Sequence, residues 1–303
     1  MRIISLISSG TEIVSSLGCS DSLVGISHEC DYPPSISELP ICSEPKIDVS
    51  GSSLEVDKQV KSLLQEALSI YRIKEEKISE LKPDIIITQS QCKVCAVSLD
   101  DVQNALKKQL GINPLIISLE PNNLNDVLID IQNLGNALGK THEANKIINT
   151  FKTEIHQLKK YNEGRKKITL ACIEWIEPLM FAGNWVPEIV DIAGASDLFG
   201  VNGEHSSWSE YSLLFKNNPD KIIFMPCGYD MKKTKSEVKS LDHMKGWSDL
   251  RAVKSGNAYI TDGSQYFNRP GPRLLDSIKI MHDIINDTDL YGFHGAGWEK
   301  IIN

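Results

Sequence analysis

Two cysteines three residues apart, Cys92 and Cys95, follow the apolar run PDIIIT at 83–88. A Cys-x-x-Cys pair can bind a metal, exchange electrons as a disulfide, or place a nucleophilic thiol beside a second one. Inert packing, or simple contact with a bound molecule, is the remaining alternative. Other thiol and imidazole groups in the chain also suit zinc or iron. The full set of candidate metal ligands is Cys30, Cys92, Cys95, Cys227 and His28.

Cysteine catalysis needs a base that takes the thiol proton and a group that orients the base. His28 has the chemistry of the base, and Glu29, Asp31 or Glu174 can supply the orienting carboxylate. The candidate catalytic residues are Cys92, Cys95, His28 and Glu174. Residue types alone leave metal binding, redox cycling, catalysis and plain ligand contact open, so the sequence does not decide whether the chain is an enzyme.

The N-terminal stretch MRIISLISSGTEIVSSLGC imitates a lipoprotein signal that ends at Cys19. Glu12 falls inside its would-be apolar core, and a buried strand followed by a helix accounts better for the same residues. We therefore expect a cytoplasmic protein without a signal peptide. The 7 cysteines are an odd set, which does not indicate a disulfide framework in a reducing compartment.

Length and charge narrow the class of protein. The chain has 303 residues and a formal net charge of −8, without a basic stripe, which argues against a non-specific nucleic-acid binder. No apolar run approaches the roughly 18 residues of a membrane helix, so we expect no membrane span. The length suffices for two lobes of about 120–150 residues each.

Apolar runs that alternate with helical patterns predict two α/β lobes, each with a parallel sheet covered on both faces. In the first half, strands are expected at 2–7, 23–27, 83–88 and 113–119, and helices at 11–17, 54–70, 74–81 and 99–110. The strand pattern restarts at 167–175, 219–228 and 257–263. The fold class is therefore α/β, with two Rossmann-like lobes.

A helical zone separates these halves. Apolar residues recur at helical spacing from Leu124 to Leu138, and again from Ala144 to Leu158. The second stretch predicts a helix roughly 35 Å long, enough to join two lobes as one rigid rod. The expected division is 1–120 for the N-terminal lobe, 121–164 for the helical segment with the linker helix, 165–290 for the C-terminal lobe, and 291–303 for a tail of unassigned structure.

Polar and aromatic residues gather just after the expected strands. Ligands of open α/β sheets bind beyond the carboxyl ends of the strands, so these loops predict a ligand site in the cleft between the lobes. Broad aromatic faces with Arg and Asn donors suit a large, flat, partly polar molecule. The predicted ligand-binding residues are His28, Asp31, Tyr32, Gln91, Cys92, Glu174, Trp175, Asn184, Trp185, Trp208, Tyr229, Tyr266, Phe267, Asn268, Arg269 and Arg273.

Several motifs carry a family resemblance in their order along the chain: RIISLISSGTEIVSSLG, LVGISHECDYPP, LKPDIIITQSQC, SSWSEYSLLFKNNPDKIIF and DGSQYFNRPGPRLLDSI. From about residue 2 to 285 the sequence resembles the cobalamin and iron-siderophore substrate-binding proteins of ABC importers, most closely the cobalamin-binding branch. The resemblance implies two α/β lobes joined by one rigid helix, the class III periplasmic-binding-protein arrangement, with a corrinoid between them. By position, Tyr32, Tyr266, Phe267 and Arg269 correspond to ligand contacts of that family, with Asp31 behind them.

Three features depart from the importer pattern: the missing export signal, Ser8 where the opening motif usually has proline, and the many Cys, His and carboxylate groups of the expected cleft. We therefore expect a cytoplasmic carrier of cobalamin or a related corrinoid. Its partners would be the small-molecule ligand and an ABC transporter or a corrinoid-using enzyme. The alternatives are an enzyme in the same cleft, with Cys92 or Cys95 as nucleophile or metal ligand, and a soft-metal carrier or sensor that holds zinc or iron.

Overall fold

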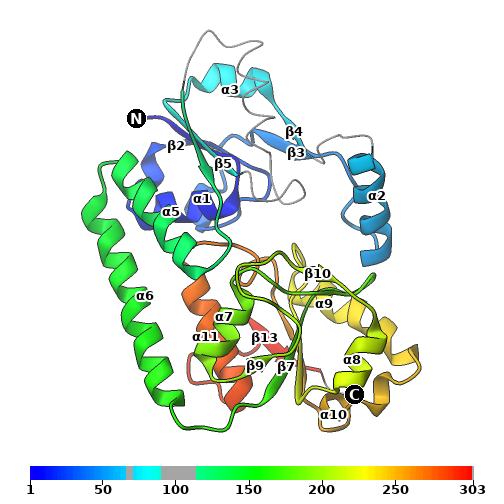
Figure 1. The fold of residues 1–303 in the computed structure, drawn as a ribbon. Coiled ribbons are helices and arrows are strands. Elements are labelled where there is room, and N and C mark those ends of the chain that lie inside the picture. Colours follow the sequence, from blue (N-terminus) through cyan, green and yellow to red (C-terminus); the bar gives the residue numbers. More distant parts are fainter. Residues whose placement is uncertain (66–70, 90–113, 302–303) are drawn as a thin grey trace. The chain divides into compact units, whose positions relative to one another are not determined.

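The computed structural model describes residues 1–65, 71–89 and 114–301, which divide into two α/β units (Figure 1). The first unit comprises Met1–Gly51, Glu55–Pro121 and Asn125–Ile148. The second unit comprises Ser52–Leu54, Asn122–Leu124 and Asn149–Asn303. In the part of the chain that the structure describes, no helix is both long and apolar enough to cross a bilayer. The expected helix at 99–110 lies outside the described residues.

A parallel sheet with the order β2-β1-β5-β6 forms the centre of the first unit. Its strands are β1 (Ile3–Ser5), β2 (Leu23–Ile26), β5 (Ile85–Gln89) and β6 (Leu115–Leu119). Each lies within or next to an apolar run that predicted it, so the strand predictions for this half are confirmed. The sequence analysis missed a separate antiparallel pair, β3 (Ser43–Pro45) with β4 (Tyr71–Ile73).

Helices of this unit and its neighbouring segments are α1 (Ser8–Ser16), α2 (Ser53–Gln65), α3 (Glu75–Leu81), α5 (Leu124–Ala137) and α6 (Thr141–Asn162), with short 3-10 turns η1 (Ser20–Ser22) and η2 (Pro34–Ile36). The predicted start of the first helix at Thr11 was wrong, because α1 begins three residues earlier at Ser8. The expected long helix is confirmed as α6, which has 22 residues and continues into the second unit from Asn149.

Side chains that alternate along β1 and β5 fill the core on both faces of the first sheet. Ile4, Leu6 and Ile86 pack with Cys42 and with Ile78 of α3 on one face. On the other face, Gly10 lets α1 approach closely: a Cβ there would lie 2.7 Å from Ile87 Cγ2. A larger residue at Gly10 would therefore push the helix off the sheet.

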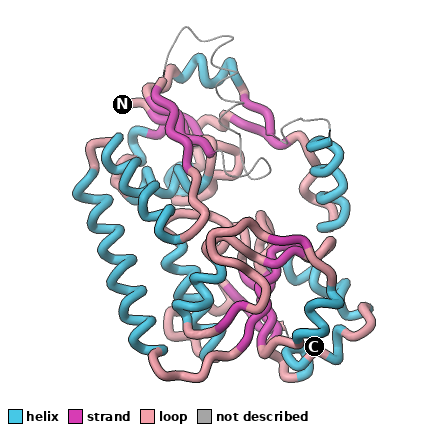
Figure 2. The backbone as a smooth tube through the Cα atoms, in the orientation of Figure 1, coloured by secondary structure: helices cyan, strands magenta, loops and turns pink. Residues whose placement is uncertain are grey.

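A second sheet, ordered β10-β8-β7-β11-β12-β13 with β9 beside β7, forms the centre of the second unit (Figure 2). The strands β7, β11 and β12 are parallel, as predicted, and β8, β10 and β13 are antiparallel additions. The strand bounds are β7 (Thr169–Trp175), β8 (Met180–Phe181), β9 (Ser196–Asp197), β10 (Ser207–Trp208), β11 (Lys221–Phe224), β12 (Ala258–Thr261) and β13 (Trp298–Lys300).

Helices cover this second sheet on two faces (Figure 1). Ala171 and Ile173 of β7 share one cluster with Leu214 of α8 and Trp247, while the residues that alternate with them, such as Cys172, face the other way. The bounds are α7 (Val186–Ala193), α8 (Tyr211–Asn217), α9 (Met231–Val238), η3 (Lys239–His243), η4 (Trp247–Asp249), α10 (Arg251–Lys254) and α11 (Leu274–Asn286).

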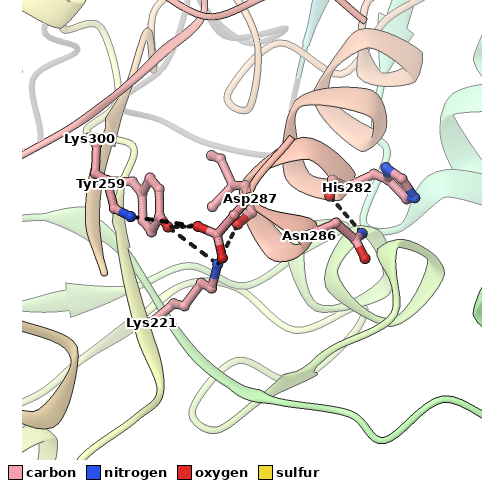
Figure 3. Close-up of polar contacts among 7 residues, drawn as sticks. Lys221, Tyr259, His282, Asn286, Asp287 and Lys300 are labelled. Carbon is pink, nitrogen blue, oxygen red and sulfur yellow. Dashed lines mark hydrogen bonds and ion pairs between the residues drawn. The ribbon is translucent and has the colours of Figure 1, made fainter. Parts of the chain in front are cut away.

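Lys221, at the amino end of β11, connects the sheet to the end of α11 (Figure 3). Its Nζ donates to Ile284 O at 2.7 Å, to Asp287 Oδ2 at 2.8 Å and to Tyr259 Oη at 3.2 Å. Tyr259 in turn donates to Asp287 Oδ1 at 2.6 Å. Burial lowers the pKa of Lys221, and the hydrogen bond that Lys221 donates to Asp287 opposes that effect only in part. A buried ammonium with three acceptors stabilises the fold only while all three remain in place.

We expect Lys221→Ala to lower the free energy of unfolding by about 2 kcal/mol, because it leaves buried acceptors without a donor. The matched control is Lys235→Ala, which removes a 2.9 Å ion pair with Glu299 at a position that is 57% exposed. This exposed pair should cost about 0.5 kcal/mol or less. Urea unfolding of both variants provides the comparison, and equal losses would contradict the importance given to the buried cluster.

Asp130 of α5 is a buried carboxyl in the first unit, and no described residue is a hydrogen-bond partner of its Oδ2. Burial raises its pKa to about 7; the backbone N–H of Glu120 opposes the rise, and the carboxylates of Asp126 and Glu120 add to it. The folded state therefore retains a proton that the unfolded chain loses at a pH of about 4. Stability from this group is full below that pH and declines as the pH rises toward 7.

Asp130→Asn should therefore remove this pH dependence and raise the free energy of unfolding at pH 8 by about 2 kcal/mol. Urea unfolding of the wild type and the variant at pH 5 and pH 8 measures the difference. Asp21→Asn, at an exposed position in η1, is the control and should change neither value. An Asp130→Asn protein that keeps the wild-type difference between the two pH values would show that Asp130 is already ionised at pH 5.

Candidate functional site

His28 follows the carboxyl end of β2, and neighbouring side chains engage both of its ring nitrogens. Nδ1 lies 2.8 Å from Ser43 Oγ, and the His28 backbone N–H donates to the same oxygen at 3.2 Å. Nε2 lies 3.2 Å from Glu29 Oε1, at ion-pair distance but without hydrogen-bond alignment. The ring also packs against Tyr71 with 5.0 Å between centroids. These contacts hold the imidazole against Ser43 of β3 and Tyr71 of β4, and its predicted roles as catalytic base, metal ligand and ligand contact stay predictions.

Beyond His28, the same loop has one buried thiol and two exposed side chains. Cys30 is 9% exposed, and its Sγ lies 3.1 Å from the Thr11 hydroxyl of α1. Asp31 is exposed, and Tyr32 is 42% exposed. Tyr32 is therefore a solvent-exposed aromatic residue of this loop, while the Cys30 thiol is buried against α1.

In the second unit, the ends of β7 and β11 bring two predicted ligand residues together. The rings of Trp175 and Tyr229 lie 5.2 Å apart at an angle of 52°, and Lys233 Nζ lies 4.4 Å above the Tyr229 ring. Trp175 Nε1 donates to Ser53 O at 3.3 Å. Tyr229 is only 4% exposed, yet its hydroxyl has no hydrogen-bond partner among the described residues. A buried hydroxyl without a partner is costly, and this one lies at the edge of the sheet where ligands bind.

Residues after β12 form a loop that is tied to the loop after β11. Ser264 N donates to Tyr229 O at 3.0 Å. Asn268 Nδ2 donates to Met225 O and to Gly263 O, both at 2.9 Å. A Cβ at Gly263 would lie 2.2 Å from Pro226 O, so only glycine permits this contact between the two loops.

Two arginines of this loop are buried. Arg269 is 6% exposed and donates to Ser264 Oγ at 3.2 Å, and Arg273 is 8% exposed and donates to Gln265 Oε1 at 3.2 Å. Phe267 is fully buried, and its carbonyl oxygen accepts a 2.8 Å hydrogen bond from Trp185 Nε1. These side chains hold the loop in shape, and whether they also contact a ligand stays a prediction.

Glu174, the predicted proton carrier, is part of a further set of hydrogen bonds. Ser206 Oγ donates to Glu174 Oε2 at 2.7 Å and accepts from Gly183 N at 3.0 Å. Asn184, the next residue, has a positive φ of 50°, and its N–H donates to Glu204 O at 2.6 Å. The arrangement positions the loop after β8 and gives Glu174 a structural partner. Trp208, on the edge strand β10, is 55% exposed.

The structure tests the predicted metal cluster only in part. Among residues 1–65, 71–89 and 114–301, no group of three or more His, Cys, Asp or Glu side chains is arranged to hold a metal ion. Gln91, Cys92 and Cys95 lie outside the described residues, so their ligand, redox and nucleophile roles stay predictions.

Two thiols outside the predicted site are unreactive. Cys172 and Cys42 are buried, and burial raises the pKa of Cys172 well above its usual value and that of Cys42 to about 11. Both thiols stay protonated near neutral pH, which agrees with the structural role expected of them.

The chain is similar in sequence to a known protein family and to several individual proteins. A family model described as periplasmic binding protein matches residues 3–264. An uncharacterized ABC transporter substrate-binding lipoprotein of Bacillus subtilis (strain 168) is 22% identical over 296 residues, 95% of this chain and 81% of that protein. A vitamin B12-binding protein of Vibrio cholerae serotype O1 is 23% identical over 282 residues, 92% of this chain and 86% of that protein.

Solved structures share the fold over nearly the whole chain. The periplasmic vitamin B12 binding protein of Vibrio cholerae aligns with a TM-score of 0.66 and 21% identity, covering 94% of this chain and 96% of that one. A periplasmic heme binding protein from Pseudomonas aeruginosa aligns with a TM-score of 0.70 and 16% identity, covering 94% and 92%. At these identities the likeness establishes the fold, and the two proteins are named for different ligands, vitamin B12 and heme.

The unpartnered hydroxyl of Tyr229 leads to a prediction about stability without any ligand. Tyr229→Phe removes a buried donor that has no hydrogen-bond partner among the described residues, so the free energy of unfolding should stay unchanged or rise by about 1 kcal/mol. Tyr259→Phe is the matched control, because that hydroxyl is also buried but donates to Asp287, and its loss should cost about 1–2 kcal/mol. Chemical denaturation measures both. A destabilised Tyr229→Phe protein would mean that the hydroxyl has a partner within the folded chain.

Proposed function

This chain belongs to the periplasmic binding protein family, and from that membership we propose that it is a solute-binding carrier for a corrinoid of the cobalamin type. The observation that carries the proposal is the pair of Trp175 and Tyr229 at the carboxyl edge of the second sheet. The half-buried Trp175 ring offers an apolar surface next to the buried Tyr229, whose hydroxyl is a donor that the described residues leave unused. A large ring system with amide groups around its rim matches both properties.

The relatives support this choice of ligand. Curated proteins that match over most of this chain include vitamin B12-binding proteins, and one solved structure with this fold has the same ligand in its title. In the first unit, Tyr32 is the corresponding exposed aromatic residue, on the loop that follows β2. We propose Tyr32 in the first unit, and the Trp175 and Tyr229 pair in the second unit, as ligand contacts. Heme and iron-siderophore ligands are the alternatives within this family, and the test below separates heme from the corrinoid.

Delivery of the corrinoid needs a partner. The similarity to ABC transporter substrate-binding proteins favours an ABC transporter, and a corrinoid-using enzyme is the second candidate. The protein's location in the cell would decide between them, because an importer receives its cargo outside the cytoplasm. Fractionation of cells that express the native chain measures that location. The enzyme and metal-carrier alternatives depend on Cys92 and Cys95 and gain no support from the described residues.

One absorption spectrum tests the proposal. The full chain is mixed with hydroxocobalamin, passed through a desalting column and scanned from the ultraviolet through the visible, and hemin is tested in parallel. We expect corrinoid bands to co-elute with the protein at about one equivalent. A protein that elutes colourless after hydroxocobalamin would contradict the proposal, and retention of hemin alone would replace the corrinoid with heme.

Substitutions then locate the site. Trp175→Ala should weaken hydroxocobalamin binding at least tenfold, because a buried aromatic anchor contributes about 2 kcal/mol or more. The control is Tyr161→Ala, which removes an aromatic ring that packs on His282 of α11 instead. Titrations followed by absorbance give both dissociation constants. Equal affinities for the two variants would move the site away from the carboxyl edge of this sheet.

A further inference from the structure

Residues 288–300, which the sequence left unassigned, form a C-terminal segment fastened at both ends (Figure 1). At its start, the fully buried carboxylate of Asp283 accepts hydrogen bonds from Thr288 Oγ1 at 2.8 Å, Leu290 N at 3.0 Å and Tyr291 N at 3.1 Å. At its end, β13 pairs with β12, and Trp298 lies opposite Thr261. Two independent anchors make the segment between them an ordered part of the second unit.

The middle of this C-terminal segment lies against the ligand loop after β12. The rings of Phe293 and Tyr266 meet edge to face, with 5.7 Å between centroids at 79°. Gly297 O accepts a hydrogen bond from Asp262 N at 3.0 Å. A Cβ at Gly297 would lie 2.8 Å from Ile280 Cδ1 and 3.3 Å from Tyr266 Cε2, so glycine is what allows the close approach.

Within its own loop, Tyr266 lies near the charged side chain of Arg273, which hydrogen bonds hold in place. The Arg273 guanidinium lies 5.6 Å from the centre of the Tyr266 ring. Arg273 is held by Gln265, and Gln265 donates to Asp262 from its backbone N at 2.8 Å and from Nε2 at 3.1 Å. Asp262 is the residue whose N–H bonds to the C-terminal segment. The ring of Tyr266 therefore has neighbours from the loop and from the segment, and Phe293 is the aromatic one.

We propose that Phe293 and Gly297 of the C-terminal segment are positioning residues that fix the Tyr266 ring for ligand binding. The inference rests on the proposed function and on the prediction from the sequence that Tyr266 contacts the ligand. Phe293 is half-buried, and neither the Asp283 anchor nor the β12–β13 pairing uses its side chain. Loss of the Phe293 ring therefore frees Tyr266 without detaching the segment, and binding must then order a mobile ring.

The first experiment titrates full-length variants with hydroxocobalamin and follows absorbance. Phe293→Ala should weaken binding about fivefold, and Phe293→Tyr, which keeps the ring edge, should restore it to within twofold of the wild type. Leu290→Ala is the control, because this residue lies in the same segment but is 70% exposed. Wild-type affinity in Phe293→Ala would overturn the inference. If Phe293→Ala fails to fold, Phe293→Leu replaces it with an apolar side chain that lacks the ring edge.

A double-mutant cycle separates positioning from general destabilisation. If Phe293 acts through Tyr266, adding Phe293→Ala to a Tyr266→Ala protein should change the dissociation constant by less than twofold. A full fivefold loss in that background would mean that Phe293 acts by another route, and the inference would be wrong.

Fluorotyrosine NMR provides a readout without ligand. The Tyr266 resonance is assigned by its absence in Tyr266→Phe, and Phe293→Ala should shift or sharpen it, whereas Leu290→Ala should not. An unchanged Tyr266 resonance would overturn the positioning role. If the wild type binds no corrinoid, the proposed function fails, and this resonance still decides whether Phe293 orders the ring.

Discussion

The parallel alignment of β7, β11 and β12 is the constraint on which the rest of the second unit depends. Their register places Ile173 opposite Phe224, and Phe224 opposite Ile260, so the three strands end at one edge. Whatever follows each strand must emerge there, which is why Trp175 and Tyr229 meet although they are far apart in the sequence. The loops are then fixed to one another by backbone hydrogen bonds, and the site depends on strand order more than on any single side chain.

The buried polar groups near the two ends of β11 differ in whether they have hydrogen-bond partners. At the amino end, Lys221 is buried with Ile284, Asp287 and Tyr259 as hydrogen-bond partners (Figure 3). Beyond the carboxyl end, Tyr229 is equally buried, but its hydroxyl lacks a partner within the described residues. Most buried polar groups in folded proteins have hydrogen-bond partners, and Tyr229 Oη and Asp130 Oδ2 are both exceptions among the described residues. The Tyr229 exception follows the carboxyl end of β11, the edge of the sheet at which we propose that the ligand binds.

Much of this fold was predictable from the sequence, because parallel strands buried on both faces appear as continuous Ile- and Val-rich runs. The loops after them were predictable for the same reason. The C-terminal segment was not, because β13 is a short antiparallel strand after a Gly-rich stretch. The start of the segment is anchored by the Asp283 carboxylate rather than by an apolar pattern. The side-chain contacts within the loops were also not predictable from the sequence. The sequence alone predicted that His28 is a reactive group and that Phe267 contacts the ligand. In the structure, Ser43 and Glu29 lie beside the His28 ring, and the Phe267 side chain is buried. The residue type indicates which interactions a side chain can make. Only the structure shows which of these interactions it already makes within the folded chain.

The central claim is that this chain carries a corrinoid rather than another large ligand of its family. Native mass spectrometry of the full chain, incubated with an equimolar mixture of cyanocobalamin, hemin and a ferric siderophore, tests it most directly. The account predicts one dominant adduct, with the mass of one cyanocobalamin per chain. An adduct with hemin or the siderophore alone, or the free protein mass in every charge state, would contradict it.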